Sequence, residues 1–225
     1  MTVASVMDPR LTSCLYRESK DRITALTTGF GDPTWNTEVA ACPGWTVRDV
    51  VAHMTAVAEG WADAHASGPP TDDETAAHIR RFDGRDGAHI LSAWTAATAK
   101  LDRLAADQGI TPPLGDVASH EYDILAALCR PSGRDSSAVW WTSDRLLTML
   151  ETTVPLRVTV EDGEYRSGPN DAPEVWLRTT RFEAMRWRTG RRSRAQLAAM
   201  DWSDDPTPVL DQLYLFGPAG NDFVE

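Results

Sequence analysis

The stretch Gly115-Asp116-Val117-Ala118-Ser119-His120-Glu121-Tyr122-Asp123 decides how the rest of the chain is interpreted. It is typical of the first turns of a helix, and Asp116 and His120 lie four residues apart in it. Residues at i and i+4 lie one above the other on the same face of a helix. A carboxylate and an imidazole in that arrangement can bind one cation together. The stretch therefore predicts part of a metal site.

A second histidine lies in a helix expected to begin at Thr46. Thr46 and Asp49 form a capping-box pattern, and His53 borders the apolar stripe that follows. If this helix packs beside the helix of Asp116 and His120, the three side chains converge. Two histidines and one carboxylate, with positions left open, is the composition of catalytic sites for zinc and similar divalent metals. Helix bundles build such sites from facing helices.

The same residues also have a purely structural interpretation. Asp116 in the first turn of a helix favours the helix dipole, and His53 and His120 can each be hydrogen-bonded residues at the edge of the core. Asp123, three residues after His120, is expected to accept a hydrogen bond from a ligand or to contact the substrate. The other histidines are predicted to be solvated surface residues: His65, His78 and His89.

Hydrophobic periodicity predicts a mainly α chain in two parts. Helical regions are expected over about 8–30, from 46 to the Ser67-Gly68-Pro69-Pro70 break, over 72–104 with interruptions at two glycines, and over 114–128. After residue 133 the pattern predicts helices at 138–150, 182–188 and 193–200, and strands at 155–160, 165–166 and 174–178. We therefore expect a four-helix domain over residues 1–133 and a small α+β domain over residues 134–225.

Bulk composition excludes several classes of function. The 225 residues are 42% hydrophobic and carry a formal net charge of -11, which opposes binding to nucleic acid or to anionic membranes. No signal-peptide pattern and no run long enough to span a bilayer is found. The three cysteines (Cys14, Cys42, Cys129) have no metal-binding spacing and fit a reducing cytoplasm.

Two further groups of residues are weaker candidates. Cys42 precedes Pro43-Gly44 in a loop just before a helix, and a packing role is expected more than a nucleophilic one. A basic run is expected either to bind an anion or to form a solvated helix end; it comprises Arg186, Arg188, Arg191, Arg192 and Arg194.

Three motifs resemble the maleylpyruvate isomerase family of mycothiol-dependent enzymes, within the DinB-like superfamily. The first is Cys42-Pro43-Gly44-Trp45-Thr46-Val47-Arg48-Asp49-Val50-Val51-Ala52-His53, and the second is the stretch from Gly115 to Ile124. The third comprises Thr189-Gly190-Arg191-Arg192-Ser193-Arg194, Asp201-Trp202 and Phe216-Gly217-Pro218. The resemblance covers nearly the whole chain.

This resemblance implies a DinB-like four-helix bundle in which His53, Asp116 and His120 fall on metal-ligand positions. The isomerase has Glu where Asp116 stands, so the shorter Asp implies a different ligand distance or metal. The resemblance also implies a small α+β domain that helps to bind mycothiol and supplies an arginine to the site. The candidates for it here are Arg181, Arg186 and Arg191.

The expected function is a cytoplasmic metal-dependent enzyme, with zinc as the expected metal and mycothiol as the thiol cosubstrate. The thiolate would add to an electrophilic small molecule, which makes the protein an S-transferase or an isomerase. Two alternatives stay open: a metal-dependent hydrolase that uses no thiol, and a non-catalytic module that binds a small molecule. The substrate, the metal and the oligomeric state are left open by the sequence.

Overall fold

The structure is a computed structural model that describes residues 8–63, 68–131, 133–170 and 174–225. His65 lies outside the described residues. The chain divides into two compact units, one of which spans Ser5–Ser132 while the other spans Gly133–Glu225. Each unit is described by itself.

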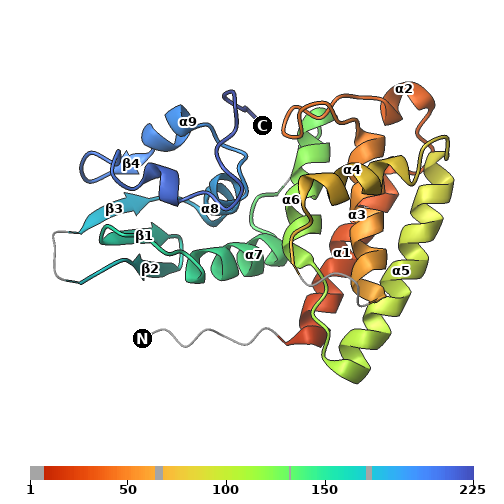
Figure 1. Ribbon diagram of the computed structural model, residues 1–225, viewed down its shortest axis with the longest axis horizontal. Helices are drawn as coiled ribbons and strands as arrows, with labels where there is room; N and C mark the ends of the chain where they lie inside the picture. The colour runs from red at the N-terminus through yellow and green to blue at the C-terminus, as the bar shows by residue number, and fades with distance from the viewer. Residues whose placement is uncertain (1–7, 64–67, 132, 171–173) are drawn as a thin grey trace. The chain divides into compact units, whose positions relative to one another are not determined.

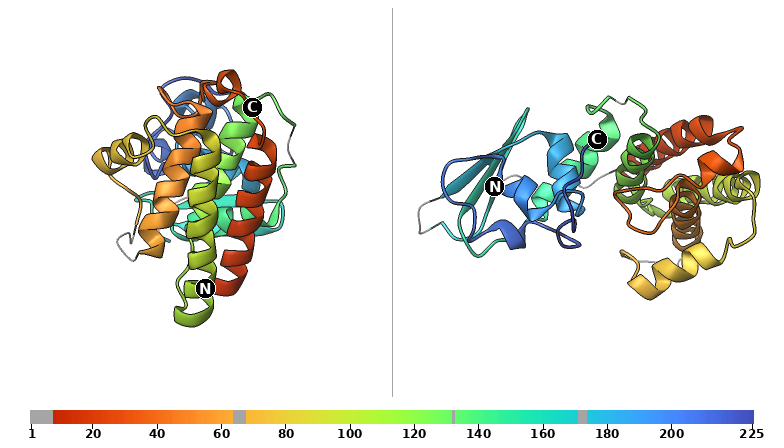
Figure 2. Two further views of the ribbon diagram at one scale, coloured as in Figure 1. Left: turned by 90° about the vertical axis from the view of Figure 1, so that its right-hand side faces the viewer. Right: turned by 90° about the horizontal axis from the view of Figure 1, so that it is seen from above.

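The first unit is a bundle of four long helices, as predicted. They are α1 (Pro9–Thr27), α3 (Val47–Ala62), α5 (Gly87–Gln108) and α6 (Leu114–Ala127). Helices α1 and α3 each pack against both α5 and α6, which closes the bundle (Figures 1 and 2). Two short helices, α2 (Asp32–Trp35) and α4 (Asp72–Arg80), lie in the connections, and both contact α3.

Local sequence explains most of the helix boundaries. The predicted capping box is confirmed: the Thr46 side chain accepts from the Asp49 amide, and the Asp49 carboxylate accepts from the Thr46 amide. Helix α2 lies between the helical regions predicted over about 8–30 and from 46; proline fits the first turn of a helix, so Asp32-Pro33 begins a short helix there. Helix α3 ends at Ala62, earlier than predicted.

Buried apolar side chains lie where the helices of the bundle pack together. Trp94 and Leu101 of α5, Val50 of α3 and Ile124 of α6 are fully buried. The Trp94 indole N–H donates to the Tyr16 hydroxyl at 2.8 Å, so the polar atoms of these two buried rings satisfy each other. The facing residues of α3 and α6 are therefore held by packing rather than by loops.

The second unit is a small α+β domain, also as predicted. Its sheet has the order β2-β1-β3-β4, from β1 (Leu156–Val160), β2 (Gly163–Ser167), β3 (Val175–Arg178) and β4 (Asp201–Trp202). Strand β1 pairs with β2 through a hairpin and with β3 in parallel. Strand β4 was not predicted, because a strand of two residues is too short to show an alternating pattern.

The same unit contains the helices α7 (Ser137–Thr148), α8 (Arg181–Arg188) and α9 (Arg194–Ala198) and a short 3-10 helix, η1 (Leu210–Gln212). Leu156 and Leu177 from the sheet, Trp187 from α8 and Leu213 belong to one buried apolar cluster. Within the described residues, none of the helices combines the length and the apolar character needed to cross a membrane.

Candidate metal centre

The structure brings His53, Asp116 and His120 together at the contact between α3 and α6. His53 is carried by α3, while Asp116 and His120 lie on one face of α6. The histidines are buried, with 4% and 7% of their surface exposed, whereas the Asp116 side chain is 23% exposed. We call these three residues the His–Asp–His triad.

The triad is arranged around one point. The Nε2 atoms of both histidines face the same carboxylate oxygen, Oδ1 of Asp116, at 3.3 Å for His53 and 3.6 Å for His120. All three ligand atoms lie within 4.8 Å of one another. Tetrahedral zinc with bonds of about 2.1 Å separates its ligand atoms by about 3.4 Å. The donor types and their spacing therefore fit a divalent cation.

Asp123 holds the opposite edge of the His120 ring. Its Oδ2 atom lies 2.9 Å from the Nδ1 of His120, and its side chain is fully buried. A carboxylate at this position keeps the proton on Nδ1, which leaves the lone pair of Nε2 directed toward Asp116. The expectation that Asp123 supports a ligand agrees with this geometry.

The turn before α3 adds two side chains that were not expected at the site. The Cys42 thiol lies 3.5 Å from Oδ2 of Asp123 and 3.8 Å from Nδ1 of His120. The Trp45 ring lies 5.2 Å from the His53 ring and 6.3 Å from the His120 ring, centroid to centroid. The two residues flank Pro43-Gly44 in the same motif as His53, and that proximity in sequence was the available signal.

His78 corrects the prediction of a solvated surface histidine. It is half-buried on α4, and its Nδ1 lies 3.5 Å from the Nδ1 of His53. Burial lowers the pKa of His78, and the neighbouring His53 lowers it further, so the neutral ring is favoured. No sequence pattern indicated this contact, because it depends on how α4 folds back onto α3.

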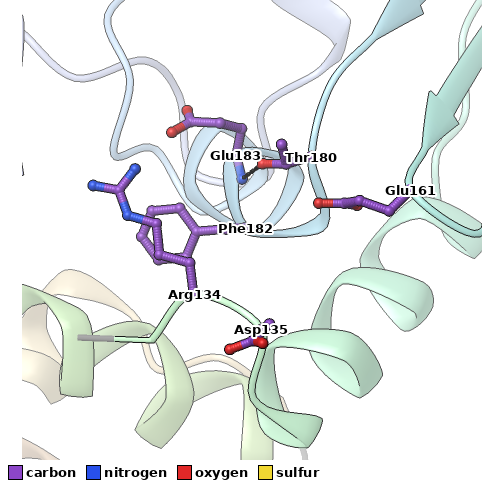
Figure 3. Close-up of a pocket in the computed structure, with 6 residues that line it drawn as sticks. All are labelled: Arg134, Asp135, Glu161, Thr180, Phe182 and Glu183. Carbon is purple, nitrogen blue, oxygen red and sulfur yellow. Dashed lines mark hydrogen bonds between the residues drawn. The ribbon is translucent and has the colours of Figure 1, made fainter.

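The second unit contains a separate pocket of about 360 Å³ (Figure 3). In Figure 3 the Arg134 side chain lies against Phe182, with its guanidinium carbon 4.7 Å from the ring centroid. The Thr180 hydroxyl caps α8 by accepting from the Glu183 amide. The lining residues are Arg134, Asp135, Glu161, Thr180, Phe182 and Glu183.

The three arginines that the family resemblance put forward have different surroundings. Arg181 donates to Asp162 at 2.5 Å and lies over the Trp140 ring. Arg186 is fully buried and donates to the Glu225 carboxylate at 2.8 Å, while Arg191 donates to the Thr189 carbonyl.

The solvated helix end proposed for the basic run is wrong for three of its members. Arg186, Arg188 and Arg192 are buried. Arg192 bonds Glu183 and Glu225, and Arg188 donates to the Leu213 carbonyl. These arginines therefore hold the second unit together.

Comparisons with known proteins agree with the fold. Residues 16–130 match the sequence family described as Mycothiol maleylpyruvate isomerase N-terminal domain. A solved structure described as the mycothiol-dependent maleylpyruvate isomerase aligns with 85% of this chain and 92% of its own, at 14% identity and a TM-score of 0.55. A histidine-to-alanine mutant of that enzyme aligns over the same shares, at 13% identity and a TM-score of 0.53. No match was found among curated proteins.

Proposed function

The chain belongs to the mycothiol maleylpyruvate isomerase N-terminal domain family, and we propose that its His–Asp–His triad holds a divalent cation, with zinc the expected ion. At this site a low-molecular-weight thiol, expected to be mycothiol, reacts with an electrophilic small molecule. One observation carries the proposal: two buried imidazoles from different helices direct their Nε2 atoms at the same carboxylate oxygen.

The three proposed ligands would leave the cation suited to bind a thiol. Two neutral imidazoles and one carboxylate leave a divalent cation with a net charge of about +1 and with at least one open position. A cation held there would supply Lewis acidity that favours the thiolate over the thiol at neutral pH. His53 and His120 contribute the neutral donors, and Asp116 contributes the single negative charge.

Neighbouring residues prepare the triad for this role. Asp123 fixes the orientation and the tautomer of His120 through the contact at Nδ1. Trp45 lies beside both histidine rings, where its apolar surface excludes water from that side. The ligands are thus held by rigid helices and by packed side chains.

The proposed chemistry begins with the thiolate adding to an unsaturated carbon conjugated with a carbonyl group, which forms a carbon–sulfur bond and moves the electron pair onto the carbonyl. If the bond breaks again after rotation, the thiol is released unchanged and the product is an isomer. If the adjacent carbon takes a proton instead, the product is an S-conjugate. The activity in the descriptions of the similar solved structures supports the isomerase outcome.

The proposed location is the cytoplasm. All three cysteines lie within the described residues and are thiols, which suits a reducing compartment.

Elemental analysis tests the proposal directly. Protein purified without an affinity tag or chelator is compared with His53→Ala, His120→Ala and the control His89→Ala, which alters an exposed histidine. We expect about one equivalent of divalent metal in the wild type and in the control, and loss of it in the two triad variants. Calorimetry with mycothiol then measures whether thiol binding requires the metal.

Turnover separates the remaining alternatives. A panel of α,β-unsaturated carboxylates is followed with and without mycothiol. Thiol-independent hydrolysis of esters or amides by the metal-loaded protein would replace the proposal with a hydrolase. Metal-free wild-type protein whose melting temperature zinc does not raise would remove the catalytic proposal and leave a small-molecule-binding module.

A further inference from the structure

The two histidines of the triad differ in what lies behind them. A histidine that binds a cation through one ring nitrogen carries a proton on the other and usually donates it to a fixed acceptor. Behind His120 that acceptor is the carboxylate of Asp123, 2.9 Å from Nδ1. For His53 the Nε2 atom faces Asp116, so Nδ1 is the nitrogen that needs an acceptor.

The atom that faces Nδ1 of His53 is Nδ1 of His78. The two nitrogens are 3.5 Å apart, and the ring centroids are 5.4 Å apart with 47° between the planes. Across the described ranges, His78 supplies the one hydrogen-bond contact found at this nitrogen. We propose that His78 is the positioning residue for His53, and that its Nδ1 accepts the Nδ1 proton of the metal-binding imidazole. This inference rests on the function proposed for the triad.

The contact fixes the tautomers of both rings. If His53 binds the cation through Nε2, its proton is on Nδ1, and His78 must present a lone pair at Nδ1 and carry its own proton on Nε2. The half-buried setting of His78, which favours the neutral ring, is compatible with this role. His78 does not touch the reacting molecules and acts only through His53.

The support behind His53 is weaker than the support behind His120. A neutral imidazole at 3.5 Å is a poorer acceptor than a buried carboxylate at 2.9 Å. His78 also lies on α4, a nine-residue helix in which no residue is fully buried and which packs against α3. The position of α4 therefore determines how firmly His53 is held.

The test removes the acceptor but keeps the ring. His78→Phe preserves a planar side chain without a lone pair, His78→Gln restores an acceptor, and His89→Phe on α5 is the matched control at an exposed site. Zinc affinity is measured by competition with a chromophoric chelator, and Co²⁺ absorption reports the ligand field. The melting temperature of the metal-free protein reports any purely structural role.

We expect His78→Phe to weaken zinc binding by about 10- to 100-fold. His78→Gln should recover part of this loss, the control should be unchanged, and the metal-free melting temperatures should stay within about 2 °C of the wild type. The Co²⁺ spectrum should keep the intensity of the same ligand number.

Three results would overturn the inference. Equal zinc affinity in His78→Phe and wild type shows that His78 does not support His53. A loss well beyond 100-fold with a changed Co²⁺ ligand number makes His78 a direct ligand instead. A wild-type protein that binds no zinc removes the proposed function as well, and this outcome is distinct because it is seen before any variant is made.

Discussion

Each unit contains a cluster of buried charged and titratable groups, and the two clusters are built differently. In the C-terminal unit, two buried arginines are matched with carboxylates: Arg186 with Glu225, and Arg192 with Glu183 and Glu225. In the helical unit, two imidazoles point at one carboxylate oxygen, and a third imidazole lies behind the first.

This difference separates charged groups that stabilise the fold from groups that are suited to bind a cation. A matched ion pair needs no external partner, so Arg186 and Arg192 contribute mainly to the folding of the C-terminal unit. The donor atoms of the triad are all of kinds that bind cations, and their spacing suits an ion that the chain does not itself supply. Substitutions in the two units should therefore change different quantities.

The largest expected effect is the loss of metal from the triad variants. His120→Ala and His53→Ala should each retain less than about one-tenth of an equivalent of zinc, because two ligands rarely hold the ion. His120→Ala should also destabilise the metal-free protein by about 3 kcal/mol, since it leaves Asp123 buried without its imidazole.

His53→Ala should cost the metal-free protein less, because the nearby Asp116 is partly exposed. Urea unfolding of the metal-free proteins measures both values. Equal destabilisation by the two variants would show that removing the imidazole beside the buried Asp123 costs no more than removing the one beside the partly exposed Asp116.

The next effect belongs to the C-terminal unit. Arg186→Met should lower the free energy of unfolding by about 3 kcal/mol, because it leaves the Glu225 carboxylate with one arginine fewer in a buried setting. Zinc affinity should stay unchanged. Arg178→Met, at an arginine whose side chain is 68% exposed, is the matched control and should change stability by less than about 0.5 kcal/mol. A loss of zinc in Arg186→Met would show that Arg186 affects metal binding as well as the stability of its own unit.

A smaller effect is expected in the turn that carries Cys42 and Trp45. Gly44 has a φ of +82°, and a Cβ at this position would have no atom within 4 Å. Gly44→Ala should therefore cost about 1 kcal/mol from backbone conformation alone. Gly220→Ala, also open but without a positive φ, should be near neutral. A tenfold or greater loss of zinc affinity in Gly44→Ala would show that the turn supports the triad as well as covering it.

The smallest expected effect is the pH dependence of the stability that Asp162 contributes. The bonds from Arg181 and Trp140 lower the pKa of the Asp162 carboxyl below its ordinary value of 3.8. A carboxyl whose pKa is lower in the folded state stabilises the fold above its unfolded pKa, and that stability disappears as the pH falls through the folded pKa.

Asp162→Asn should thus lower the free energy of unfolding by about 0.5 kcal/mol between pH 7 and pH 5. The difference from the wild type should shrink below about pH 3.8. The exposed Glu151→Gln is the control in the same unit. A difference that persists unchanged in acid would assign the effect to packing.

The sequence by itself predicted the four long helices of the bundle and brought forward the three residues of the triad. Apolar spacing and the Thr46–Asp49 capping box predicted α3, and the i, i+4 spacing put Asp116 and His120 on one face of α6. These features are local, because helical periodicity and capping depend on residues a few positions apart. The division into a helical bundle and a small α+β part was predicted because the spacing of apolar residues changes after residue 133.

Tertiary structure alone decided what surrounds the triad and which charges are satisfied internally. His78 reaches His53 only because α4 packs on α3, and Arg186 meets Glu225 across 39 positions of sequence. The 3.3 Å approach of His53 to Asp116 likewise depends on how α3 packs against α6. Such contacts join segments whose separation is set by core packing, and no spacing within one helix can encode it.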